Sequence, residues 1–256
     1  MKIYTITDIG LSRTENQDRV KAEVLNEITG FTVLCDGMGG ENAGSEASET
    51  AVDVIFERVT KVYRRDYDDF TTQQLLLSAL NTANSVILDA SVSDPEKKGM
   101  GTTCVCALLR GTKLHAVSVG DSRIYIIAAD GIHQITHDHS LVMQKYESGL
   151  ITKDELRTHP QRNFITKALG LPYAPEPDYF ELELHDDDIV LLCSDGLSTY
   201  CEDSDIFSMC KNFKGDELLE ELVKVALGNG GKDNITVALM YSENEITESD
   251  EISEKS

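Results

Sequence analysis

Four aspartates in this sequence stand directly beside apolar segments that read as buried strands. Three of them follow such a segment and precede a small residue, in the pairs Asp36-Gly37, Asp121-Ser122 and Asp195-Gly196. The fourth, Asp233, comes shortly before the apolar run at residues 235–240. A strand that runs the opposite way places its first residue beside the last residues of its neighbours. We therefore expect all four carboxylates to converge at one end of a sheet core.

Carboxylates at close quarters repel one another and lose hydration, so they take up protons unless something neutralises them. A divalent cation does this best, and carboxylate, carbonyl and water ligands suit Mg²⁺ or Mn²⁺ rather than zinc. The glycines after Asp36 and Asp195 let the backbone approach an ion, with the Gly37 carbonyl as a further ligand. A single Asp-Gly pair is usually only a turn, as we expect of Asp130-Gly131. Four aspartates beside strands instead favour a metal site.

An arginine and another aspartate lie close together in the hexapeptide RTENQD at residues 13–18. A lone arginine at this place would be an ordinary surface charge. Beside a metal centre, the planar fork of Arg13 matches two oxygens of a phosphate group. Arg13 is therefore a candidate phosphate-binding residue.

Short strands rich in β-branched residues must position these side chains. We expect strands at residues 2–9, 30–35, 102–109, 113–119, 123–129, 179–184, 189–193 and 235–241. Turn residues at 110–112 and 129–131 predict tight hairpins, and thus largely antiparallel pairing. Amphipathic spacing predicts helices at residues 43–63, 71–90, 206–212 and 217–227. This order of elements predicts sheets faced by helices within one domain.

Two segments depart from that pattern. Residues 141–170 are the least strand-like part of the middle, and we expect helical pieces and loops inserted over one end of the sheets. Residues 242–256 carry six carboxylates and lack periodicity, which predicts an acidic disordered tail. The single domain is then expected to span residues 1–241.

The composition bears on compartment and partners. The net charge of −22 argues against nucleic acid and against a nuclease, because phosphate backbones need lysine and arginine. The acidity by itself could serve only solubility. Six scattered cysteines without a C-x-x-C pair read as small buried residues in a reducing cytoplasm. No run approaches the roughly 18–20 apolar residues of a membrane span. We expect a cytoplasmic monomer without membrane or nucleic-acid partners.

Eight short motifs make about residues 3–241 resemble the protein phosphatase 2C family, or PPM-type phosphatases, in its bacterial branch. Any one of them is weak, whereas the ordered set is specific. They are RTENQD (13–18), DGMGG (36–40), GTT (101–103), GDSR (120–123), THDHS (136–140), ITKALG (165–170), SDGL (194–197) and DNIT (233–236). The resemblance implies an α+β fold, a four-layer αββα sandwich of two antiparallel sheets flanked by helix pairs. In the family, the segment matching 141–170 is a mobile flap over the substrate site.

The resemblance also implies a ligand set for two Mn²⁺ or Mg²⁺ ions. Asp36 resembles the carboxylate that bridges both ions, with the Gly37 carbonyl on the second ion. Asp195 and Asp233 resemble ligands of the first ion. Asp121 resembles the residue that forms a third, weaker site together with Asp195.

The implied reaction is in-line attack on phosphoserine or phosphothreonine by a hydroxide that bridges the two ions, without a phosphoenzyme. Asp18 would orient the metal-bound water, and Arg13 would stabilise charge on the phosphate oxygens. Asn234 would support the ligands or face the substrate. Met38 stands where eukaryotic relatives carry a histidine proposed as general acid, so that role is unassigned. We expect the two histidines of the THDHS motif to be structural.

The implied partners are phosphorylated proteins and a bacterial Ser/Thr kinase that the enzyme opposes. A phosphatase dedicated to one regulatory partner, such as an anti-sigma-factor antagonist, is an alternative, although such regulators usually carry an additional sensor domain. A pseudophosphatase that only binds phosphoproteins is a second alternative. It predicts lost metal ligands, yet Asp36, Asp195 and Asp233 are all retained.

Overall fold

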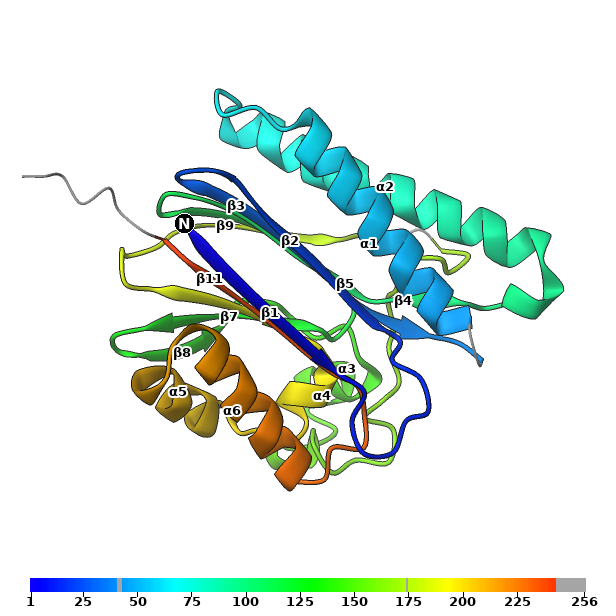
Figure 1. The fold of residues 1–256 in the computed structure, drawn as a ribbon. Coiled ribbons are helices and arrows are strands. Elements are labelled where there is room, and N and C mark those ends of the chain that lie inside the picture. The colour runs from blue at the N-terminus through cyan, green and yellow to red at the C-terminus, as the bar shows by residue number, and fades with distance from the viewer. Residues whose placement is uncertain (41–42, 174, 243–256) are drawn as a thin grey trace, which may run out of the picture.

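The computed structural model describes residues 1–40, 43–173 and 175–242, and its centre is a pair of antiparallel sheets packed face to face (Figure 1). The first sheet has five strands in the order β1 (Lys2–Asp8), β11 (Ile235–Tyr241), β10 (Ile189–Cys193), β7 (Arg123–Ala128) and β8 (Gly131–Gln134). The second sheet has the order β2 (Asp18–Asn26), β3 (Thr29–Met38), β5 (Cys104–Arg110), β6 (Lys113–Val119) and β9 (Asp178–Glu183), and the short β4 (Gly101–Thr102) also pairs with β3.

Two pairs of helices form the outer layers. The helices α1 (Ala43–Val62) and α2 (Asp69–Ser93) cover the second sheet, and α5 (Asp203–Asn212) and α6 (Gly215–Gly228) cover the first (Figure 1). This arrangement confirms the expected four-layer αββα sandwich. The remaining helical pieces are short: 3₁₀-helix η1 (Pro95–Lys97), α3 (Leu141–Glu147), 3₁₀-helix η2 (Lys153–Glu155) and α4 (Asp195–Ser198).

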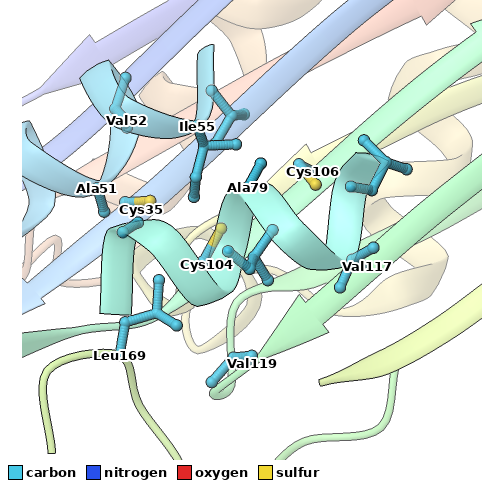
Figure 2. Packing of buried hydrophobic residues seen from close by; sticks show 14 of the residues in the cluster. Cys35, Ala51, Val52, Ile55, Ala79, Cys104, Cys106, Val117, Val119 and Leu169 are labelled. Carbon is cyan, nitrogen blue, oxygen red and sulfur yellow. The ribbon is translucent and has the colours of Figure 1, made fainter. Parts of the chain in front are cut away.

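Three apolar clusters hold the layers together. One lies between the two sheets, one between the first sheet and α5–α6, and one between the second sheet and α1–α2. In the last of these, Cys35, Cys104 and Cys106 pack among aliphatic side chains of α1 and α2 (Figure 2). All six cysteines are free and buried, as the sequence predicts.

The predicted elements are found with small shifts at their ends, except that the strand expected at 102–109 is divided into β4 and β5. The turns at 110–112 and 129–131 do connect hairpins, because Arg110 pairs with Lys113 and Ala128 pairs with Gly131. The strands β2 and β8 and the four-residue α4 were missed. Of the predicted tail, residues 243–256 lie outside the part that the structure describes.

Helix α2 is long and apolar enough to cross a membrane, by length and composition alone. No such segment was expected from the sequence. In the fold the apolar face of α2 packs in the core with α1, where Leu76, Leu80 and Ile87 are fully buried.

Residues 141–170, which we call the flap, contain α3, η2 and turns. The two ends of the flap meet at a bridge between Ser140 and Ile165. The Leu141 amide donates to the Phe164 carbonyl at 2.8 Å, which closes this junction. The flap therefore leaves the core and returns to it at one point.

Candidate active site

A pocket of about 180 Å³ opens where the strands of both sheets end. Its lining includes four aspartates that the sequence singled out, namely Asp36, Asp121, Asp195 and Asp233. Arg13, Gly37 and Asn234 line the same pocket, together with Asn163 and Ile165 from the flap. Asp18 does not line it, because it is only 2% exposed and lies below. Arg13 and Asp233, which are 220 positions apart in sequence, thus meet at one place.

Asp36 is held by Thr103, the residue between β4 and β5. Its amide donates to Thr103 Oγ1 at 3.1 Å, and its carbonyl accepts from the Thr103 amide at 2.8 Å. Thr103 Oγ1 also lies 2.8 Å from the Oγ of Ser122, the residue that follows Asp121. Since Thr103 and Ser122 are almost fully buried, this hydroxyl pair fixes the spacing between the backbones that carry Asp36 and Asp121.

Asp18 pairs with Asp36 across β2 and β3, and its side chain points toward the first sheet. Ser194 Oγ donates to Asp18 Oδ2 at 2.7 Å and accepts from the Thr236 amide at 3.0 Å. Ser194 precedes Asp195, and Thr236 follows the Asp233-Asn234 pair. One hydroxyl therefore aligns the ends of β10 and β11 with Asp18 of the other sheet.

The side chain of Asn234 is bonded on both sides to the N-terminal loop. Its Nδ2 donates to the carbonyls of Ile9 and Glu15 at 2.9 and 3.0 Å, and its Oδ1 accepts from the Gln17 amide at 2.9 Å. These bonds position the loop that carries Arg13. Arg13 Nη2 lies 2.8 Å from Asp233 Oδ2, and the arginine side chain is 49% exposed.

Two glycines permit close backbone approach at the pocket. A Cβ at Gly37 would lie 2.0 Å from the Gly44 carbonyl oxygen, and one at Gly196 would lie 1.9 Å from the Asn234 carbonyl oxygen. Neither position admits a side chain, because real Cβ atoms do not come within 3.0 Å of backbone. The requirement for glycine after Asp36 and Asp195 is thus explained by packing.

Burial and mutual repulsion make these carboxyl groups hard to ionise. Burial raises the pKa of Asp36 well above its usual range, and the charges of Asp18 and Asp195 raise it further. Burial followed by the charges of Asp121 and Asp233 likewise raises the pKa of Asp195.

The other two shifts have the same principal cause. Burial raises the pKa of Asp18 to about 6, although hydrogen bonds from Ser194 and Thr236 oppose the shift. Burial, then the charge of Asp138, raises the pKa of Asp121 to about 7. The pocket is therefore short of positive charge.

The donors in the pocket fit hard divalent cations. They are carboxylate oxygens, together with backbone carbonyls brought near by glycine, and Asp121 Oδ1 is buried without a hydrogen-bond partner. Within the described residues, no three His, Cys, Asp or Glu side chains lie close enough together to form a ready group of metal ligands. Asp233 instead points to Arg13, and Asp18 to Ser194. An ion here would thus compete with those contacts for the carboxylates.

Sequence reasoning gave no role to Thr103, Ser194, Thr236 or Ser122, although all four lie in or next to quoted motifs. The signal available was the presence of one of these hydroxyl residues in each of four motifs, GTT, GDSR, SDGL and DNIT. It became informative only once the strands were paired, because each hydroxyl bonds a residue that is distant in sequence.

Comparison with known proteins gives a consistent result. The family model for protein phosphatase 2C matches residues 12–236. Protein phosphatase PhpP of Streptococcus pneumoniae is 35% identical over 258 residues, which cover 97% of this chain and 100% of that protein. The crystal structure of Serine/threonine phosphatase Stp1 from Staphylococcus aureus is 36% identical, with a TM-score of 0.88 and coverage of 95% of each chain. The catalytic domain of the phosphatase PstP, solved in complex with two manganese ions, is 31% identical with a TM-score of 0.82, covering 93% of this chain and 96% of that one.

Proposed function

Because this chain belongs to the protein phosphatase 2C family and is a protein-serine/threonine phosphatase, we propose that its aspartate pocket holds two divalent ions and hydrolyses phosphoserine and phosphothreonine directly with water. The observation that supports this mechanism most is the crowding of four carboxylates in one pocket, where burial and neighbouring charges raise the pKa of Asp36 and of Asp195. The relative that was solved with two manganese ions favours Mn²⁺ or Mg²⁺ as the ions.

In this proposal Asp36 would serve as a ligand for both ions, the Gly37 carbonyl for the second ion, and Asp195 and Asp233 for the first. Asp121, with its unpartnered Oδ1, would contribute to a third site together with Asp195. Ions of this kind, when bound, would supply the Lewis acidity that activates water for in-line attack near neutral pH.

The remaining residues bind and orient. Arg13 is half exposed at the rim, so its guanidinium can turn from Asp233 to two oxygens of the phosphate group and stabilise their charge. Asp18, held by Ser194, lies below Asp36 and helps to orient the attacking water. Asn234 fixes the loop that carries Arg13, and we assign it this supporting role at the substrate site.

Phosphorylated proteins are the substrates that follow from this activity. We propose that the enzyme opposes a bacterial Ser/Thr kinase and works as a cytoplasmic monomer, and the six free, buried cysteines suit that reducing compartment. The alternative is service to a single regulatory phosphoprotein.

The test is hydrolysis of a phosphothreonine peptide with Mn²⁺, with EDTA, and by Asp36→Asn. We expect EDTA to abolish turnover and Asp36→Asn to lower kcat by at least roughly 100-fold. Asp130→Asn is the matched control, because Asp130 also precedes a glycine but lies exposed in the β7–β8 hairpin. Activity that survives both EDTA and the substitution would rule out the two-ion mechanism. Mn²⁺ binding without turnover of any phosphopeptide would favour a pseudophosphatase.

A further inference from the structure

His139 is a buried imidazole that lies outside the pocket and has a partner at each ring nitrogen. Its Nδ1 accepts from the Gly120 amide at 3.0 Å, and its Nε2 lies 3.1 Å from Asp178 Oδ2. Because a backbone amide can only donate, Nδ1 carries no proton, and the Nε2–H donates to Asp178. Burial, then the charge of Lys167, lowers the pKa of His139, which agrees with a neutral ring. The tautomer is therefore set by Asp178.

The backbone of His139 makes two more connections. Its amide donates to the Gly120 carbonyl at 2.9 Å, so His139 hydrogen-bonds both the amide and the carbonyl of Gly120. Its carbonyl accepts from the Thr166 amide at 2.7 Å. Thr166 lies in the flap directly after Ile165, which lines the pocket.

Gly120 has little freedom to move. Its φ is +107°, and a Cβ there would lie 2.6 Å from the side chain of Thr103. The residue that follows is Asp121, which lines the pocket. A displacement of Gly120 would therefore move Asp121 and press on Thr103, which holds Asp36.

We propose that His139 is a positioning residue for the phosphatase reaction: it fixes Asp121 through Gly120, and it ties the returning end of the flap to the same point through Thr166. Asp178 holds the ring in the tautomer that accepts from Gly120. The inference rests on the proposed role of Asp121 and adds His139 and Asp178 to the residues on which that role depends. The histidine that the sequence analysis left as structural thus joins the flap to the metal pocket.

Two substitutions of His139 test the contacts of its two ring nitrogens separately. His139→Asn keeps an acceptor oxygen on Cγ, at the place of Nδ1, but cannot reach Asp178. His139→Gln carries its amide one bond further, so it can reach Asp178 but has no acceptor on Cγ. Asp178→Ala removes the acceptor from Nε2–H without touching His139. Lys167→Ala controls for the second contact that this variant loses, which is the 3.6 Å ion pair between Lys167 Nζ and Asp178 Oδ1. His133→Ala is the control, since His133 is 53% exposed in β8 and pairs with Asp130.

We expect His139→Gln to lower kcat roughly 10- to 100-fold and to weaken Mn²⁺ binding, measured by calorimetry, by a similar factor. KM for a small phosphate monoester should change less than about 3-fold, because Arg13 is untouched. His139→Asn should retain most of the activity, Asp178→Ala should fall between the two, and His133→Ala should match the wild type. Equal losses in His139→Asn and His139→Gln would overturn the proposal.

A readout that needs no turnover is the exchange rate of the Gly120 amide, followed by NMR. We expect exchange at least roughly 10-fold faster in His139→Gln and in Asp178→Ala, and unchanged in His139→Asn. A protected Gly120 amide in either of the first two variants would contradict the proposal. If His139→Gln does not fold, Asp178→Ala decides the question alone. A wild type that binds Mn²⁺ without turnover would refute the proposed function, and these exchange rates would still test His139.

Discussion

The Ser194 hydroxyl donates to Asp18 Oδ2 over 2.7 Å, and this bond joins the two sheets directly beneath the pocket. Ser194 follows β10 of the first sheet, and Asp18 begins β2 of the second. The same oxygen accepts from the Thr236 amide, so the ends of three strands meet at one buried hydroxyl. The position and orientation of the Asp18 side chain therefore depend on how the two sheets are aligned with each other.

Ser194→Ala should destabilise the protein and impair turnover. The change removes one hydrogen-bond donor from the buried Asp18 carboxylate and the acceptor from the buried Thr236 amide, which costs about 1–3 kcal/mol of unfolding free energy. Urea unfolding measures that loss, and phosphopeptide hydrolysis measures the effect on kcat. Ser85→Ala, on the exposed side of α2, is the control and should stay within about 0.5 kcal/mol of the wild type. Equal stability of the two variants would show that the inter-sheet bond contributes nothing.

Gly196→Ala should damage the site through its backbone. The new Cβ would lie 1.9 Å from the Asn234 carbonyl oxygen, so α4 and the start of β11 must separate. We expect a loss of about 1–3 kcal/mol in stability together with reduced Mn²⁺ affinity, measured by thermal unfolding and calorimetry. Gly228→Ala at the end of α6 meets no atom within 4 Å and should be neutral or slightly stabilising. Unchanged metal affinity in Gly196→Ala would argue against Asp195 as a ligand.

Asp121 should make stability in EDTA fall as pH rises. Its folded-state pKa is about 7 against an ordinary value of 3.8, so the folded protein keeps this proton to a higher pH than the unfolded chain does. The stability from this group is fully present below pH 4 and is lost as pH rises through about 7. Asp121→Asn lacks this loss, so calorimetric Tm values of wild type minus variant should fall by several degrees between about pH 5 and pH 8.

Saturating Mn²⁺ should close that difference, because the ion then balances the carboxylate charge. Asp130→Asn serves as the control, since Asp130 is exposed and its pKa is lowered by His133. Parallel Tm curves for wild type and Asp121→Asn in EDTA would mean that Asp121 does not carry the raised pKa.

Arg157→Ala should loosen the flap without unfolding the domain. Arg157 Nη1 lies 2.6 Å from Glu202 Oε1, and Nη2 donates to the Cys201 carbonyl at 3.2 Å, which ties the flap to the loop after α4. An exposed ion pair contributes about 1 kcal/mol or less, so global stability should hardly change. Hydrogen exchange at residues 153–159 should nevertheless increase. Lys61→Ala, which breaks an exposed pair with Glu57 in α1, should leave flap exchange as in the wild type. Unaltered exchange in Arg157→Ala would show that the flap is held elsewhere.

The sequence predicted the parts of the fold that have clear local signals. Helix α1 was expected at 43–63 and is found at Ala43–Val62, because its apolar spacing is regular. The strands β6, β10 and β11 have the expected bounds, since each is a short, largely apolar segment between turns. The strand β2 was missed because it is an edge strand with few buried positions and a mixed, partly charged sequence. Helix α4 is too short to show a period.

The site was predictable to the extent that its functional residues stand next to recognisable strands in the sequence. Asp36, Asp121, Asp195 and Asp233 could be chosen one by one, and antiparallel pairing placed them in one pocket. The contacts between them could not be predicted. Ser194 and Asp18 are 176 residues apart, and the link of His139 to Gly120 depends on where the flap returns. Such pairings are decided by tertiary register, which no local pattern contains.

The position of β11 also has a consequence for synthesis. It is the last described strand of the chain, yet it lies inside the first sheet between β1 and β10, and it follows Asp233, the partner of Arg13. Because a polypeptide is synthesised from its N-terminus, β1 and Arg13 leave the ribosome before their neighbours β11 and Asp233 have been made. The first sheet and the contact between Arg13 and Asp233 can therefore form only after β11 has been synthesised.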